Sequence, residues 1–192
     1  RHLLLARNLA SALERYHRDV SNTFKLIVST PDLWAVSDQI AETLADFELT
    51  HICIADTTGQ LLHQIATPQA ACPNILSAEL LSKFKAQASG AVMFSEVTKS
   101  LKGDNILQVF KALPDGRIAF GDLRTDYFVE LGQAISFGKM GHAAIVDHVG
   151  NVLFHPLPAW TASRQNISGV SAVQRMMRGE TGVETFFSPA LN

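Results

Sequence analysis

Apolar side chains recur at helical spacing through the first 28 residues of the chain, and neither Gly nor Pro interrupts them. The stripe consists of Leu9, Leu13, Tyr16, Val20, Phe24 and Ile27. At 1.5 Å per residue such a helix is about 40 Å long. Because this exceeds what one small core needs as a cover, we expect part of the helix to meet a partner helix or to project toward a membrane.

A second helix is predicted after Thr30-Pro31, where Thr30 is a suitable N-cap and Pro31 loses no hydrogen bond at the first helical position. The helical pattern continues to about residue 48. From His51 the apolar period changes to two, which predicts strands over 52–55 and 61–65 around a turn at 56–59.

The pattern downstream alternates between strands and short helices, so the fold class is α+β. Predicted strands cover 91–97, 106–113, 117–123 and 183–187, and predicted helices cover 76–88, 125–137 and 171–178. The second and third of these strands are joined by Pro114-Asp115-Gly116, which is a strong signal for a tight turn.

One strand–turn–strand pattern occurs twice, about ninety residues apart. Residues 51–63 read HICIADTTGQLLH, and residues 141–156 read GHAAIVDHVGNVLFHP. Both copies contain Asp-x-x-Gly between two apolar runs. The repetition predicts two related modules in tandem.

Composition limits the classes of function. The formal net charge is −2 and 47% of the residues are hydrophobic, so nothing directs the chain toward nucleic acid or an anionic surface. No apolar stretch approaches the roughly 20 residues of a membrane span. The chain begins with Arg1 rather than Met. We therefore expect it to be a piece of a longer protein whose flanks carry membrane spans or an output domain.

The two cysteines are too few for a disulfide scaffold. Cys53 lies in a predicted strand and Cys72 in a loop. A bridge between them would suit an oxidising compartment, but a buried small hydrophobic residue and a separate loop thiol is the favoured interpretation.

The order of these elements resembles the double Cache sensor domains (tandem PAS-like domains) of bacterial transmembrane receptors. The strand before the linking helix matches the family pattern at Gly116, Gly121, Asp122 and Leu123. The second hairpin matches it at Asp147, Gly150, His155 and Pro156, and 179–182 also fits. The resemblance covers nearly the whole chain.

The resemblance implies a periplasmic or extracellular module without chemistry of its own, tethered to an inner-membrane histidine kinase, cyclic-di-GMP enzyme or chemoreceptor. Residues 1–48 would form the long first helix and the second helix. Residues 49–124 would form the membrane-distal module, 125–140 the linking helix, and 141–192 an incomplete membrane-proximal module. Amino-acid-binding relatives carry an Arg and a Trp-Tyr pair that 66–111 lacks, so the ligand class stays open.

Asp122 is the first candidate binding residue, because it is the only acid on an apolar strand and the matching residue in relatives faces the ligand. Capping of the next helix or pairing with Arg124 is the competing interpretation.

Lys111, beside Phe110 on the neighbouring strand, is a candidate for binding a ligand carboxylate, although an exposed strand lysine is favoured. Ser95 and Phe94 are candidates for a hydroxyl and an aromatic wall, against ordinary strand alternation.

No metal, cofactor or catalytic motif is predicted. His142, His148 and His155 lie at different ends of one hairpin, without the spacing of a zinc site. The nucleophile motif Gly-x-Ser-x-Gly and a phosphate-binding loop are both missing from the sequence.

The preferred hypothesis is a sensor that binds an organic acid, an amine or an amino acid near Asp122, as a homodimer through the first helix. Its membrane contact would come only through flanking spans, and no nucleic-acid partner is expected. The alternative is a periplasmic interaction or dimerisation module without a small-molecule ligand.

Overall fold

The computed structural model describes residues 2–183 apart from 69, 71, 88, 135 and 138–140. The chain divides into two compact units. One consists of Tyr16–Arg124, and the other of Arg1–Arg15 together with Thr125–Asn192. The first of these, the sheet unit, contains the sheet that carries the predicted binding residues.

The predicted long helix is confirmed as α1, His2–Ser29. Its stripe residues Val20, Phe24 and Ile27 are buried in the sheet unit, which explains why the helical period is so regular there. A short 3₁₀-helix, η1 (Pro31–Val36), and α2 (Ser37–Asp46) follow. Thr30 is the N-cap residue of η1 and Pro31 lies in its first turn, as predicted, but the Thr30 side chain makes no capping hydrogen bond.

An antiparallel sheet with strand order β2-β1-β6-β5-β3 forms the centre of the sheet unit, and β4 also pairs with β5. Its strands are β1 (His51–Ala55), β2 (Leu61–Ala66), β3 (Met93–Phe94), β4 (Thr98–Lys99), β5 (Asn105–Ala112) and β6 (Ile118–Arg124). The chain therefore places β6, the strand of the candidate Asp122, between β1 and β5.

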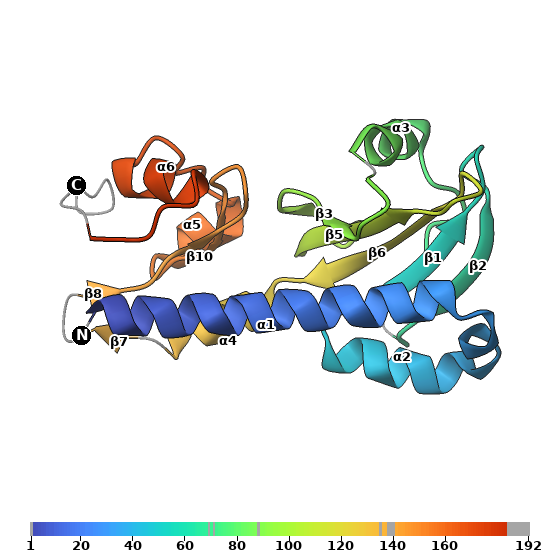
Figure 1. The fold of residues 1–192 in the computed structure, drawn as a ribbon, viewed down its shortest axis with the longest axis horizontal. Helices are drawn as coiled ribbons and strands as arrows, with labels where there is room; N and C mark the ends of the chain where they lie inside the picture. The colour runs from blue at the N-terminus through green and yellow to red at the C-terminus, as the bar shows by residue number, and fades with distance from the viewer. Residues whose placement is uncertain are drawn as a thin grey trace. The chain divides into compact units, whose positions relative to one another are not determined.

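Helices cover both faces of this sheet. The part of α1 that belongs to the sheet unit lies with α2 on one side, and α3 (Ala78–Gln87) lies on the other (Figure 1). Leu81 and Phe84 of α3 pack in one cluster with Cys53 of β1 and Phe110 of β5. We call the side of the sheet that bears this cluster the α3 face.

The strand predicted over 91–97 is wrong as a single element. It divides into β3 and β4 because Ser95 interrupts the ladder. The buried Ser95 hydroxyl accepts a hydrogen bond from the backbone N–H of Gln108 (2.9 Å) and donates one to the carbonyl of Glu96 (2.7 Å). Near the point where the strand breaks, the Gln108 backbone N–H thus bonds to the Ser95 side chain instead of to a backbone carbonyl.

The repeated Asp-x-x-Gly pattern forms a turn with the same hydrogen bonds in both places. Asp56 Oδ1 accepts from the backbone N–H of residues 58 and 60, at 2.8 and 3.0 Å. Asp147 Oδ1 accepts from residues 149 and 151, at 3.0 and 2.9 Å. Gly59 and Gly150 complete the turns with φ of 93° and 89°, which a residue with a Cβ adopts only under strain.

A close backbone approach joins β6 to β1. A Cβ added to Gly121 would lie 2.2 Å from the carbonyl oxygen of His51. The pairing shifts by one residue here: Cys53 is opposite Phe120, whereas the next bridge joins Leu49 to Leu123. Glycine at 121 therefore permits the irregular pairing beside the candidate Asp122.

A disulfide joins Cys53 to Cys72, so the interpretation as separate thiols is wrong. The bridge attaches the segment between β2 and α3 to the interior strand β1. Cys53 is fully buried, and the partly buried Cys72 packs against the same cluster as α3. The disulfide therefore belongs to the core of the α3 face.

The second unit contains shorter elements. They are α4 (Asp126–Gln133), β7 (Ser136–Phe137), β8 (Gly141–His142), β9 (Ile145–Val146), β10 (Val152–Phe154), α5 (Pro158–Ser163) and α6 (Ser171–Met177). β9 pairs with β10 and β7 with β8. The helix predicted over 125–137 is wrong in its last turn, since Gln133 ends α4. The strand predicted over 183–187 lies almost wholly outside the described residues.

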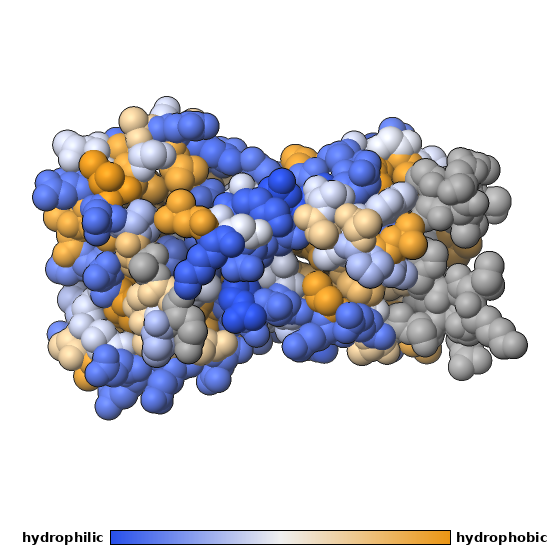
Figure 2. All heavy atoms as spheres, turned by 180° about the vertical axis from the view of Figure 1, so that it is seen from behind, coloured by the Kyte–Doolittle hydropathy of each residue, from blue (hydrophilic) through white to orange (hydrophobic). Residues whose placement is uncertain are grey.

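Among the described helices, none combines the length and the apolar character that crossing a bilayer needs. On the face shown in Figure 2, hydrophobic residues form separate patches between hydrophilic ones. Leu26 and Leu101 are among the large apolar side chains that are exposed.

Replacing Gly121 with Ala should destabilise the sheet unit, because the new methyl group must displace the His51 backbone. We expect a loss of about 1–3 kcal/mol in the free energy of unfolding, measured by urea denaturation. Gly169→Ala is the matched control, since a Cβ at Gly169 meets nothing within 4 Å. Equal stability of the two variants would contradict the close approach.

Removal of the disulfide should also lower stability. The cysteines are 19 residues apart, and closing a loop of that size stabilises a fold by about 3 kcal/mol. Denaturant unfolding of the wild type with and without a thiol-free phosphine reductant measures the loss. The double variant Cys53→Ala/Cys72→Ala should show the same loss and no response to the reductant. A wild type that does not respond once mass spectrometry shows full reduction would contradict the prediction.

Candidate functional site

Asp122 lies on the α3 face of β6. Successive side chains of a strand point to opposite faces, and Phe120, two residues earlier, packs in the α3-face cluster. The register places Gln108 of β5 directly opposite Asp122. Gln108 is two residues from Phe110, which is also in that cluster. The carboxylate and the amide therefore project from neighbouring strands on the same side of the sheet.

His51, at the start of β1, lies on the same face. Its ring meets the ring of Phe120 edge-on at a centroid distance of 6.2 Å. One ring nitrogen also lies within 4.8 Å of the sulfur atoms of Cys53 and Cys72. His51 Nδ1 shares a hydrogen bond of 3.0 Å with the hydroxyl of Thr50, whose backbone N–H donates to the Asp122 carbonyl. We call His51, Gln108 and Asp122 the polar cluster.

Burial dominates the electrostatics of the polar cluster. It raises the pKa of Asp122 to about 6 and lowers the pKa of His51 to about 4. In both cases the cause is the loss of water around the charged form. At neutral pH the cluster therefore holds one carboxylate and a neutral imidazole.

The Asp122 carboxylate has no hydrogen-bond or ion-pair partner within the described part of the chain. Neither competing interpretation from the sequence is observed there. The guanidinium of Arg124 pairs with Glu48, with Nε and Oε2 3.4 Å apart. The N-cap residue of α4 is Thr125 rather than Asp122. Asp122 is partly buried, and a carboxylate that has lost part of its water without gaining a partner is destabilising, so this position is suited to an external donor or cation.

Aromatic rings form the apolar part of the α3 face. Phe84 of α3 stacks on Phe110 with centroids 4.3 Å apart and planes 15° apart, and its centroid is 6.3 Å from that of Phe120. The predicted residue Phe110 is thus on the same face as Asp122. Its ring is fully buried against α3.

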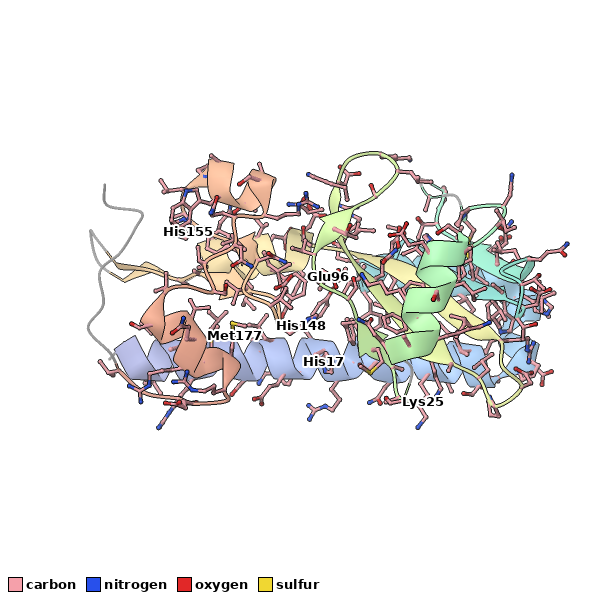
Figure 3. All side chains as sticks on the ribbon, turned by 90° about the horizontal axis from the view of Figure 1, so that it is seen from above. His17, Lys25, Glu96, His148, His155 and Met177 are labelled. Atoms are coloured by element: carbon pink, nitrogen blue, oxygen red, sulfur yellow. A yellow bond between two sulfur atoms is a disulfide. The ribbon has the colours of Figure 1, made fainter. Side chains whose placement is uncertain are left out.

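Lys111 and Phe94 lie on the opposite face of the sheet. The ring of Phe94 packs on His17 of α1, labelled in Figure 3, at a centroid distance of 4.6 Å. Lys111 pairs with Ala119 in the register, and its ammonium donates to the carbonyl of Gly90. The structure therefore does not bring either side chain to Asp122.

Ser95 is adjacent to the polar cluster through Gln108. Its hydroxyl, however, already bonds the backbone of Gln108 and Glu96. Of the predicted residues, the structure brings Asp122 and Phe110 to the α3 face and sets Ser95 beside it. Lys111 and Phe94 face the other way.

Gln108 and His51 were not among the residues predicted from the sequence. A signal for Gln108 was present: the turn at 114–116 pairs Leu113 with Arg117, and counting back along both strands places residue 108 opposite 122. No such signal exists for His51, because the register shift beside Gly121 decides its position.

His51, Cys53 and Cys72 have ligand atoms close enough to share a metal ion. The two sulfur atoms are bonded to each other, so they are not available as thiolate ligands. His148 is exposed in its turn, whereas His155 is buried and its ring packs at a tilt against that of Trp160, with centroids 4.5 Å apart. The side chain of His142 lies outside the described residues.

The fold is similar to several solved sensor domains. The extracellular domain of rpHK1S-Z16, assigned as a histidine kinase, matches 98% of this chain and 82% of its own, with a TM-score of 0.74 and 17% identity. The ligand-binding domain of the Pseudomonas fluorescens chemoreceptor CtaA with L-serine matches 86% and 73%, with a TM-score of 0.60 and 21% identity. The sensory domain of the Campylobacter jejuni chemoreceptor Tlp3 with isoleucine matches 97% and 82%, with a TM-score of 0.60 and 10% identity.

This chain has the fold of an extracellular sensor domain. The fold resemblance expected from the sequence is thereby confirmed. No protein-family model matches the chain, and no curated protein matches it in sequence. At these identities the likeness defines the fold, and the residues of the polar cluster must support any argument about a ligand.

The two titrating residues of the polar cluster should affect stability in opposite directions. Asp122 keeps its proton up to a higher pH in the folded state than in the unfolded state, so its contribution to stability falls as pH rises from about 3.8 to about 6. His51 loses its proton at a lower pH in the folded state than in the unfolded state, so its contribution to stability rises with pH between about 4 and about 6.5. The two slopes therefore offset each other in the wild type.

Asp122→Asn should make the free energy of unfolding rise more steeply with pH between 4 and 6 than in the wild type, by about 1 kcal/mol per pH unit. His51→Gln should make it fall over the same interval. Urea unfolding at half-unit pH steps measures both slopes. Variant profiles parallel to that of the wild type would contradict the assignment.

Proposed function

We propose that this chain is the extracytoplasmic ligand-sensing domain of a membrane-bound signal-transduction protein. The fold supports this, because its structural neighbours are extracellular or ligand-binding domains of a histidine kinase and of chemoreceptors. The disulfide also supports it, since such bonds persist in oxidising compartments outside the cytoplasm. The full-length protein then carries a kinase, cyclic-di-GMP or chemotaxis output domain.

The observation that carries the proposal is the partly buried, unpartnered carboxylate of Asp122. In the described residues nothing within the fold neutralises it, although burial raises its pKa. If Asp122 had only a structural role, the fold would be more stable with a partner for its carboxylate or with an apolar residue in its place. The proposed binding site therefore lies at the polar cluster, beside the aromatic rings of the α3 face.

Ligand binding there acts on the rest of the protein by shifting a conformational equilibrium. The size of that shift equals the difference in ligand affinity between the two states. In the proposed protein, α1 relays the change toward the membrane as part of a homodimer. The flanking membrane spans belong to segments beyond this sequence.

A protein-interaction module without a small-molecule ligand is the second candidate. The packing under α3 favours it, because Phe84, Phe110 and Phe120 fill the centre of the α3 face. The polar cluster, at the Asp122 end of β6, distinguishes the two candidates. An interaction module has no use for an unpaired carboxylate in that position.

A ligand screen tests the proposed function. Thermal-shift measurements of the chain with a panel of organic acids, amines and amino acids should give at least one stabilising compound. A ligand at 100 times its Kd stabilises the fold by about 2.7 kcal/mol. Asp122→Asn should abolish that shift, whereas Asp104→Asn, at an exposed position, should retain it. A silent panel, or a hit that Asp122→Asn binds equally well, would contradict the proposal.

A further inference from the structure

We propose that the ligand of the polar cluster is an organic ammonium ion without a carboxylate, rather than an α-amino acid. The inference rests on the proposed function and specifies its ligand class. It follows from which charges reach the polar cluster and which are engaged elsewhere in the sheet unit.

The polar cluster has a negative charge and no positive one. Asp122 supplies the carboxylate, and Gln108 opposite supplies a neutral amide. His51 is the only other titratable member of the cluster, and burial keeps its imidazole neutral at physiological pH. A bound ammonium ion completes this arrangement, because it gives the partly buried carboxylate of Asp122 an ion-pair partner with hydrogen bonds.

The cations on the α3 side of the sheet unit have other partners. Lys83 of α3 pairs with Glu96, labelled in Figure 3, at 2.7 Å. Lys85 donates to the carbonyl of Thr57 at 2.9 Å. Arg124, which shares the face of Asp122 on β6, pairs with Glu48.

The remaining cations of the sheet unit lie elsewhere. Lys111 projects from the opposite face of β5, and Arg117 pairs with Asp115 at 2.7 Å in the turn before β6. Lys99, at the end of β4, and Lys102, in the turn between β4 and β5, are exposed. Arg18 and Lys25 belong to α1, on the other side of the sheet (Figure 1).

An α-amino acid would bring a second carboxylate to this arrangement. Its ammonium group can pair with Asp122, but its carboxylate then lies a few ångströms away with only neutral donors nearby. Desolvating an anion without a counter-charge is costly, and the Asp122 carboxylate would repel it. An amine avoids this penalty, and its apolar part can contact the Phe120 ring at the edge of the aromatic cluster.

Two matched sets of compounds test the inference by isothermal titration calorimetry of the chain at pH 7.5. The first set is L-leucine, its decarboxylated analogue isopentylamine and its deaminated analogue 4-methylpentanoate. The second is L-phenylalanine, 2-phenylethylamine and 3-phenylpropanoate. Within each set the apolar group is constant and only the charged groups change.

We expect the amine of at least one set to bind at least about 10-fold more tightly than its parent amino acid, and the acid not to bind. Asp122→Asn should weaken the amine at least about 10-fold, with Asp104→Asn as the unaffected control. The second variant is Gln108→Lys, which keeps the Asp122 carboxylate and places a lysine opposite it as an ion-pair partner. The ammonium group of this lysine should pair with Asp122 and weaken amine binding about as much as Asp122→Asn does.

Binding of an amino acid or an acid as tight as that of the matched amine would overturn the inference and leave the proposed function standing. If all six compounds fail, the wider panel decides. Hits there that carry a carboxylate overturn the inference alone, hits among carboxylate-free amines support it, and a silent panel overturns both proposals. Amine binding that survives Gln108→Lys would also overturn it.

Discussion

The pairing of β6 with β5 and β1 determines which side chains reach the α3 face. On one side the register with β5 is regular and places Gln108 opposite Asp122. On the other side the pairing with β1 shifts by one residue, where Gly121 admits the His51 backbone. The polar cluster exists because these two pairings, one regular and one irregular, meet on the same strand.

The α3 face joins this polar cluster to an apolar core. The Cys53–Cys72 disulfide and α3 close that core, and the stacked rings of Phe84 and Phe110 fill it. Among the residues that the structure describes, none gives the carboxylate of Asp122, beside this core, a counter-charge. Stability and the proposed recognition therefore oppose each other locally, since a residue that relieved the buried charge would also remove the feature that selects an ammonium group.

Much of the architecture was predictable because it depends on local periodicity. The stripe on α1, the two Asp-x-x-Gly turns and the tight turn before β6 all follow from side-chain spacing and turn chemistry. The errors have physical causes that act over longer distances. Ser95 breaks a strand by bonding the backbone of the neighbouring β5. Cys72 reaches Cys53 only because the segment before α3 folds back over β1.

The sequence by itself determined the class of the fold, the repeated Asp-x-x-Gly turn and the choice of Asp122 as a candidate residue, because each depends on the order and period of nearby residues. Only the tertiary structure decided which residues lie near Asp122. Strand alternation and register placed Gln108 and His51 beside it and turned Lys111 and Phe94 to the other face. Burial of a charge depends on what packs around it in three dimensions, and no local pattern records that.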